Sequence, residues 1–117
     1  MGGGYGSGSI PGSNGFKIEV KSIARSLPSD PNKLSKRVWK ETSHQNAASL
    51  GHRSFFHKDS GIEIRFDRKK DGAPGFRGKN HYHILNPNKT GKSNAYLDKN
   101  GNPVARNSDA SHILPTR

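Results

Sequence analysis

Cysteine is absent from the chain, so neither disulfide bonds nor thiolate metal ligands can hold the fold together. No apolar run approaches the roughly 20 residues that a membrane-spanning helix needs, and the first residues lack the basic-then-apolar pattern of a signal peptide. Hydrophobic residues make up only 28% of the chain, so its core must be built from few side chains. These absences predict a small domain that does not insert into a membrane.

Acidic residues are also scarce. The chain has 9 Asp and Glu against 20 Lys and Arg, which gives a net charge of +11. Between Arg68 and Lys92, seven basic residues stand against one acidic residue, Asp71. Such a concentrated positive field attracts polyanions, with nucleic acid first, an acidic protein second and anionic lipid third. No amphipathic basic helix supports the lipid alternative.

The chain length of 117 residues fits one domain. Residues 1–15 are rich in glycine and serine and cannot bury enough apolar surface to become ordered, so we expect a flexible linker there. Residues 16–117 then form the single folded domain.

The first part of the domain contains signals for a strand and a helix. Residues 16–20 alternate apolar with charged side chains, which is typical of a half-buried strand or of an extended arm laid on the domain. Ser29 or Asp30 can cap a helix that begins at Pro31. We expect that helix to cover residues 31–48 and Trp39 to pack it against a sheet.

The remainder predicts antiparallel strands. Residues 53–57 and 62–67 read as a hairpin, residues 68–80 as a long basic loop, and residues 81–85 and 95–97 as further strands. Asn-Gly at 100–101 favours a type I′ turn. The predicted fold class is α+β, with an N-terminal helix packed on an antiparallel sheet of four to five strands.

A period of two places His81 and His83 on one face of their strand and Tyr82 on the other, core-facing side. If the strands over 62–67 and 81–85 are neighbours, Glu63 and Arg65 share the open face with both histidines. Cleavage of RNA without a metal needs a base for the 2′-hydroxyl, an acid for the leaving 5′-oxygen and cations for the phosphorane. This group of side chains supplies each part.

Two further residues join these candidates. Lys79 precedes the histidine strand, and the terminal segment could bring His112 back over the sheet. Arg65 has an equally good alternative role as an ion-pair partner of Glu63 or Asp67. The other three histidines, His44, His52 and His57, are interpreted as structural or surface residues.

Two alternatives stay open. His-X-His can ligate Zn²⁺ or Fe²⁺, with Glu63 completing the set, as a metal-dependent deoxyribonuclease would need. The many lysines disfavour a cation, and no compact acidic cluster compensates, so we expect no metal and no other cofactor.

The second alternative is a non-catalytic basic module that binds nucleic acid. Exposed aromatic residues for base stacking are scarce, with only Phe76 free in the basic loop.

Four segments carry a resemblance to a known group of proteins. They are residues 53–61, residues 78–87 (GKNHYHILNP), residues 96–104 (YLDKNGNPV) and residues 111–113 (SHI). Over residues 51–115 the chain resembles the C-terminal toxin domains of bacterial polymorphic toxins, contact-dependent growth inhibition proteins and bacteriocins. Many such domains are ribonucleases of the barnase–EndoU–colicin–RelE class, in which a helix precedes an antiparallel sheet. The glycine-rich start is similar to the tethers between toxin tips and their delivery modules.

The resemblance implies a cytotoxic endoribonuclease that is delivered from a producing bacterium, acts in the cytoplasm of a target cell and works as a monomer. Transfer RNA is the favoured substrate, and an acidic immunity protein is the implied partner. The expected catalytic residues are His81, His83, Lys79, Arg65 and His112. The expected RNA-binding residues are Arg68, Lys69, Lys70, Arg77, Lys89, Lys92 and Arg53.

Overall fold

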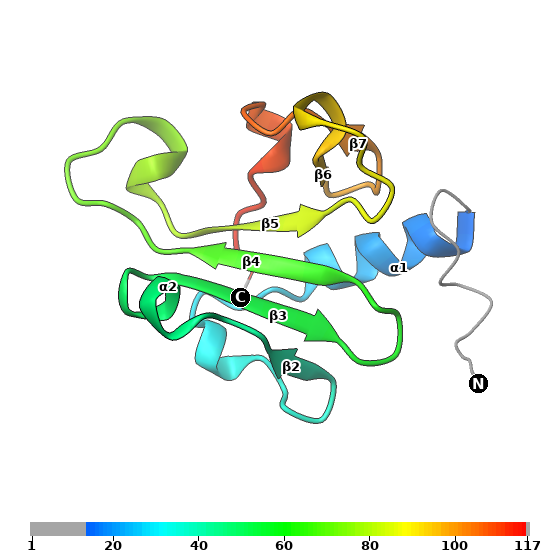
Figure 1. Cartoon of the computed structure of the whole chain (residues 1–117), viewed down its shortest axis with the longest axis horizontal. Coiled ribbons are helices and arrows are strands. Elements are labelled where there is room, and N and C mark those ends of the chain that lie inside the picture. The colour runs from blue at the N-terminus through cyan, green and yellow to red at the C-terminus, as the bar shows by residue number, and fades with distance from the viewer. Residues whose placement is uncertain (1–13, 117) are drawn as a thin grey trace.

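The computed structural model describes residues 14–116, in which a long helix lies against an antiparallel sheet (Figure 1). The sheet has six strands in the order β2-β3-β4-β5-β6-β7, so each strand pairs with its neighbours along the chain. The α-helices are α1 (Asn14–Arg25) and α2 (Gln45–Ser49), and the 3-10 helices are η2 (Pro31–Lys33), η3 (Gly75–Gly78), η4 (Lys92–Asn94) and η5 (Asp109–Ser111). The strands are β2 (Trp39–Glu41), β3 (His52–His57), β4 (Glu63–Asp67), β5 (His81–Leu85), β6 (Tyr96–Leu97) and β7 (Pro103–Val104).

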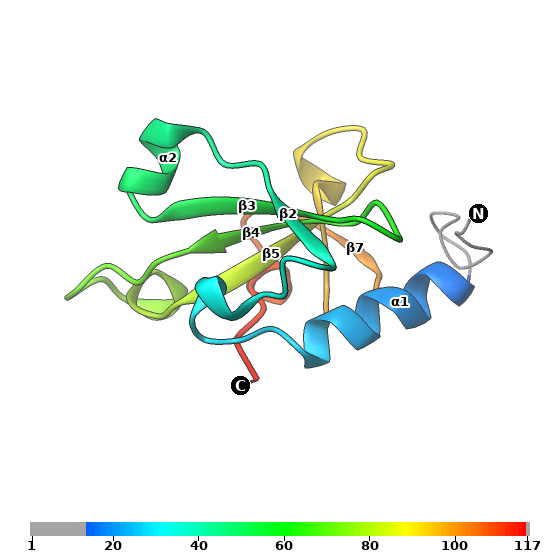
Figure 2. The ribbon, with the colours of Figure 1, turned by 90° about the horizontal axis from the view of Figure 1, so that it is seen from below.

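The fold class is confirmed as α+β, with six strands rather than four to five. The residues that form the helix were predicted wrongly. Residues 16–20 are not a strand but part of α1, whose apolar side chains Phe16, Val20 and Ile23 are buried at spacings of four and three residues. Ile18, which completes the apparent alternation, is 65% exposed. Figure 2 shows α1 lying along one face of the sheet.

The predicted helix over residues 31–48 is also wrong. Its start signal is real, because the Asp30 side chain accepts a hydrogen bond from the Asn32 backbone N–H at 2.9 Å, but only the single turn η2 follows. Too few apolar residues then recur at helical spacing to bury one face. Trp39 instead begins β2 and pairs with His57, so it packs into the core from a strand.

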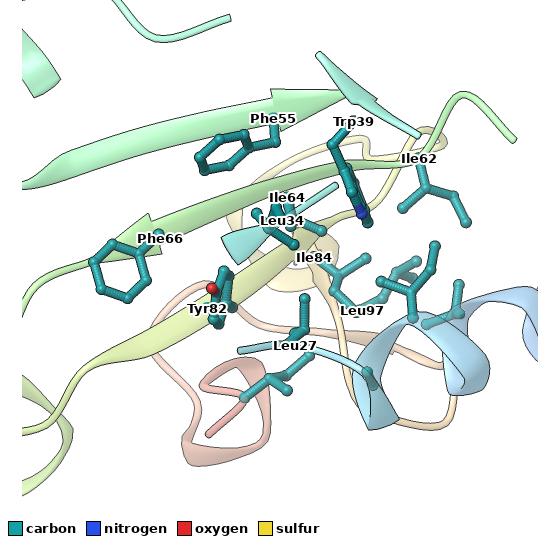
Figure 3. Close-up of a cluster of buried hydrophobic side chains, with 14 of the residues drawn as sticks. Leu27, Leu34, Trp39, Phe55, Ile62, Ile64, Phe66, Tyr82, Ile84 and Leu97 are labelled. Carbon is teal, nitrogen blue, oxygen red and sulfur yellow. The ribbon is translucent and has the colours of Figure 1, made fainter. Parts of the chain in front are cut away.

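The strands predicted over residues 53–57, 62–67, 81–85 and 95–97 are confirmed to within one residue at their ends. The side of the sheet that faces α1 carries the core, which Figure 3 shows in close-up. Tyr82 is fully buried there, and its hydroxyl donates a hydrogen bond to the Pro28 carbonyl at 2.7 Å. Ile64 and Ile84, directly opposite one another in β4 and β5, are also fully buried. The core assignment of Tyr82 and Ile84 is therefore correct.

The turn between β6 and β7 differs from the predicted type I′. Type I′ needs a positive φ at both central residues, and no described non-glycine residue has one. The turn closes when the Gly101 N–H donates to the Asp98 carbonyl at 3.0 Å. Within this turn, only Gly101 has a left-handed φ, at +86°, and a Cβ added there would meet Lys17 of α1 at about 3.1 Å.

Two sequence predictions concern the ends and surroundings of the domain. Of the predicted linker over residues 1–15, residues 1–13 lie outside the described part, and residues 14 and 15 already belong to α1. Among the described residues, no helix combines the length and the apolar character required to cross a membrane.

Candidate active site

The carboxylate of Asp67 is the centre of a cluster of polar side chains on the sheet face opposite α1. Its Oδ1 accepts hydrogen bonds from His52 Nδ1 at 2.7 Å and Arg65 Nε at 3.1 Å. Its Oδ2 accepts from Arg65 Nη2 at 3.0 Å and lies 3.3 Å and 3.5 Å from Nε2 of His83 and His81. Burial alone would raise the pKa of Asp67, but these four side chains hold it well below its usual range. Asp67 is therefore a fixed negative charge.

Strand register brings these side chains together. In the antiparallel pairs, Asp67 is opposite His52 on one side and His81 on the other, and Arg65 is opposite His83. Directly opposite residues point to the same face of a sheet. The predicted shared face of Arg65 and the two histidines is therefore observed, but the face is not open, because His81 and His83 are only 5% and 3% exposed.

The C-terminal segment runs along the edge of β5 at this end of the sheet. Tyr82 and Ile113 form an antiparallel bridge with two backbone hydrogen bonds of 2.8 Å, so the preceding residue, His112, lies across from His83. The His112 ring centroid is 4.9 Å from that of His81 and 4.8 Å from that of His83. The terminal segment thus brings a third imidazole beside His81 and His83, and the sequence prediction that this segment returns to the sheet is confirmed.

The three imidazoles are oriented in the same way. In each, Nδ1 lies at hydrogen-bond distance from a backbone carbonyl, so that nitrogen carries the proton. The acceptors are the carbonyls of Lys79 for His81 at 2.9 Å, Ser111 for His83 at 2.8 Å and Ser108 for His112 at 2.9 Å. The nitrogen that each ring presents to the cluster is therefore Nε2.

The environments of two of the histidines push their pKa values apart. Burial alone would lower the pKa of His81, but the Asp67 carboxylate and the Lys79 carbonyl raise it above its ordinary value. Burial lowers the pKa of His83, and the nearby Arg65 charge adds to the effect despite the pull of Asp67. These surroundings favour the protonated form of His81 and the neutral form of His83, and a separation of this kind is typical of acid–base sites.

Aromatic contacts hold the rings in place. His112 stacks on Phe76 at a centroid distance of 4.7 Å with an angle of 12° between the planes. His83 stacks on Tyr96 at 4.5 Å, and Tyr96 also lies under the Arg65 guanidinium at 5.6 Å. Phe76, predicted to be free, is thus a support for His112.

The cluster lines a pocket of about 230 Å³ whose other walls are mostly basic. They are formed by Arg68, Lys70, Arg77, Arg106 and Asn107 in addition to the residues described above. A second pocket of about 450 Å³ shares Arg65, Tyr96 and Arg106 with the first, and its lining also includes Lys89 and Lys92. The two pockets form one basic groove along the sheet face, which we call the histidine groove.

Most, but not all, predicted site residues line this groove. His81, His83, His112 and Arg65 converge, whereas the exposed Lys79 contributes its carbonyl and is not among the lining side chains. Glu63 is exposed and lines the second pocket, away from the histidines. The prediction that Lys79 acts beside His81 and His83 therefore finds no support in the geometry.

The predicted RNA-binding residues divide in the same way. Arg68, Lys70 and Arg77 line the first pocket and Lys89 and Lys92 the second. Lys69 lines a third hollow beside Leu50, whose lining also includes Arg68 and Lys70. Arg53 is opposite Phe66 in the register and so belongs to the face that packs on α1. Its guanidinium makes two hydrogen bonds to Glu41, at 2.8 and 2.9 Å, and is a structural ion pair.

Sequence reasoning missed Asp67, His52, Tyr96 and Arg106. Asp67 was assigned outward only as a partner for Arg65, and His52 was interpreted as structural, yet His52 lies two residues before Ser54 on the groove face. That period of two was the available signal. For Arg106, which follows β7 in an irregular segment, no local signal pointed to the groove.

The structural interpretation of His57 is consistent with its contacts. His57 is 8% exposed, its Nδ1 accepts hydrogen bonds from the Ser60 N–H and hydroxyl at 3.1 and 2.8 Å, and its ring meets Trp39 edge-on. Burial lowers the pKa of His57. His44 is exposed and precedes α2 without capping it through its side chain, so it serves as a control residue below.

No protein-family model, curated protein or solved structure matches this chain. The assignment of function therefore depends on the groove and on the sequence motifs.

Proposed function

We propose that the protein is a metal-independent endoribonuclease whose active site is the histidine groove. The observation that carries the proposal is the convergence of His52, His81 and His83 on the buried carboxylate of Asp67, with His112 against the rings of His81 and His83, in a pocket with basic walls. A polyanion with a reactive hydroxyl beside its phosphate is the substrate that such a pocket fits best.

His112 is the proposed general base. Its Nδ1 proton is held by the Ser108 carbonyl, so Nε2 has the lone pair that can accept the 2′-hydroxyl proton. His112 is also half-buried, in contrast to His81 and His83. A substrate that enters the pocket therefore has more direct access to this ring.

His81 is the proposed general acid. The Asp67 carboxylate favours its protonated form, and a protonated Nε2 can give its proton to the leaving 5′-oxygen. One ring nitrogen of each of His81, His83 and His112 lies within 4.8 Å of the others, so one bound phosphate can contact both the base and the acid. His83 is the proposed positioning residue between them.

The basic walls supply the charge stabilisation. Arg65 is held by two hydrogen bonds to Asp67, and Arg68, Lys70 and Arg77 surround the same pocket. Preorganised cations lower the energy of a pentacovalent phosphorane, in which negative charge accumulates on the phosphate oxygens.

The biological role that we propose is that of a delivered toxin in competition between bacteria, with transfer RNA as the target. The four resembling segments support this role, and two of them contain His81, His83 and His112. The proposed partner is an acidic immunity protein that covers the groove, because carboxylates can occupy the positions of the substrate phosphates. The net charge of +11 favours such a partner.

The test is a cleavage assay with the purified chain on total RNA, on transfer RNA and on single- and double-stranded DNA, each with and without EDTA. We expect cleavage of RNA that EDTA does not abolish. Cleavage of DNA that EDTA stops would favour the metal-dependent deoxyribonuclease instead. If RNA is bound but stays intact overnight, both nuclease interpretations are wrong and the protein is a non-catalytic module that binds nucleic acid.

The basic walls allow a separate prediction. The double variant Lys70→Ala/Arg77→Ala removes two side chains of the first pocket and should weaken RNA binding. If each contacts one phosphate, the slope of log K against log salt concentration should fall by about 1.4, at about 0.7 per contact with a single strand. Fluorescence anisotropy with labelled RNA over a salt series measures this slope.

The matched control is Lys21→Ala/Arg25→Ala, which removes the same charge from exposed positions of α1, on the other side of the sheet. Its salt slope should remain close to that of the wild type. Equal slopes for both double variants would show that RNA does not lie in the histidine groove.

A further inference from the structure

The imidazoles of His81, His83 and His112, in which the ring centroid of His112 lies within 4.9 Å of each of the other two, also have the arrangement of a metal-binding triad. His81, His83 and His112 each place Nδ1 against a backbone carbonyl at 2.8 to 2.9 Å. In protein metal sites, a ligating histidine almost always gives its second ring proton to a carbonyl or carboxylate, which fixes the tautomer and aims the free nitrogen at the ion. Here three rings that come from two separate segments share this arrangement.

The Nε2 nitrogens also converge. One ring nitrogen from each histidine lies within 4.8 Å of those of the other two, and Nε2 is the nitrogen not engaged by a carbonyl. The rings of His81 and His83 are almost fully buried, with side-chain exposures of 6% and 4%. Asp67 Oδ2 lies 3.5 and 3.3 Å from their Nε2 atoms. A set of lone pairs this close together favours a shared proton or a shared cation.

We propose that the Nε2 atoms of His81, His83 and His112 bind one divalent cation of the Zn²⁺ class, and that this ion inhibits the nuclease. Imidazole nitrogen suits Zn²⁺, Ni²⁺, Co²⁺ and Cu²⁺, whereas Mg²⁺ and Ca²⁺ prefer oxygen ligands. A Zn–N distance of about 2.0–2.1 Å in a tetrahedron puts ligand nitrogens about 3.3 Å apart. Displacements of the ring nitrogens of about 1 Å would therefore bring the three Nε2 atoms to the spacing that Zn²⁺ requires.

The charges around the three histidines determine their affinity for a cation. Arg65 lies beside the cluster and opposes a cation, but it makes two hydrogen bonds to Asp67, and the ionised Asp67 offsets part of this opposition. Glu63, the ligand that sequence reasoning suggested, lines the other pocket. His112 takes the place of Glu63 as third ligand, and the groove leaves the fourth position of the ion accessible to water or phosphate.

Inhibition follows because the ion and the substrate need the same atoms. A cation on Nε2 of His112 occupies the lone pair of the proposed base, and on His81 it replaces the proton of the proposed acid. This half of the inference rests on the proposed function. The binding half rests only on the geometry of the three rings.

Binding is tested on the full untagged chain, because an affinity tag of histidines would bind the same ions. Co²⁺ is the spectroscopic probe and ZnCl₂ the titrant in calorimetry. We expect one ion per chain, with visible absorption bands of four-coordinate Co²⁺. His112→Ala should weaken binding by at least about tenfold, since it removes a direct ligand, while the exposed His44→Ala should leave it unchanged.

A measurement on the wild-type chain avoids dependence on variants that fail to fold. In an NMR titration with Zn²⁺, the imidazole signals of His81, His83 and His112 should shift together at one equivalent, and those of His44 and His57 should not. Shifts spread over all histidines, or equal Co²⁺ affinity of the His112→Ala and His44→Ala variants, would overturn the metal site.

RNA cleavage during the Zn²⁺ titration separates the two proposals. Cleavage that falls in proportion to bound Zn²⁺ supports both. If Zn²⁺ binds to the triad and RNA is cleaved only when Zn²⁺ is present, the metal site is supported. Inhibition by the ion and the metal-independent mechanism are then both wrong. EDTA-resistant cleavage with no Zn²⁺ binding overturns the metal site and leaves the proposed function intact.

Discussion

Replacement of His112 by alanine is expected to lower the rate of RNA cleavage by about 10²- to 10⁴-fold, the usual contribution of a general base. The substitution removes the one imidazole of the triad that is supplied by the C-terminal segment. It should leave the fold in place, because His112 packs on Phe76 and the groove and lies outside the core under α1. Single-turnover cleavage of a labelled RNA measures the effect.

A positioning role and a catalytic role of His112 can be distinguished. Imidazole added to the buffer should restore part of the activity of His112→Ala if the lost group transferred a proton, because the truncated side chain leaves space beside the pocket. Imidazole should not help Phe76→Ala, in which the ring of His112 loses its stacking partner but is still present. His44→Ala is the inert control, and a His112→Ala variant with wild-type activity would remove His112 from the mechanism.

The same experiment on His83 is less informative. His83 is 3% exposed and makes contacts with Ser111, Asp67 and Tyr96. The sequence predicted an exposed ring on an open face, from which a substitution would leave stability unchanged. In the folded chain a loss of activity in His83→Ala could arise from a shift of the C-terminal segment. His112 is therefore the sharper probe of the mechanism.

Local sequence pattern was sufficient for the central strands. In β4 and β5 the apolar residues alternate with polar ones, so the side of each residue followed directly from a period of two. The same logic failed at the N-terminus. Phe16, Ile18 and Val20 alternate as in a strand, but the buried residues Phe16, Val20 and Ile23 recur at helical spacing. The apolar stripe of this helix of 12 residues can be recognised only when the pattern is read over its whole length and not over five residues.

The site was predictable only where it lies on regular strands. His81, His83 and Arg65 could be placed on one face, but the role of Asp67 depends on His52 from a third strand, and a local pattern does not give the register between strands. The position of His112 depends on the bridge between Tyr82 and Ile113. Long-range pairings of this kind are set by the packing of the whole domain.

Tyr82→Ala should have the largest effect on stability, a loss of about 3–5 kcal/mol in the free energy of unfolding, as for other buried aromatic residues. Tyr82 is fully buried and packs edge-on against Phe66 at 5.2 Å. A core drawn from few apolar side chains cannot easily fill the resulting cavity. Chemical denaturation followed by circular dichroism measures the change.

Tyr82→Phe isolates the contribution of the hydroxyl. It keeps the ring but leaves the Pro28 carbonyl without its donor at 2.7 Å, which should cost about 1–3 kcal/mol. His112→Ala should unfold close to the wild type in the same experiment, since its ring faces the groove. If Tyr82→Ala lowered the free energy of unfolding less than His112→Ala does, the assignment of faces would be inverted. The side of the sheet that carries the histidines, and not the side that carries Tyr82, would then form the core. The proposed active site depends on the opposite order, because catalytic side chains must be removable without loss of the sheet that positions them.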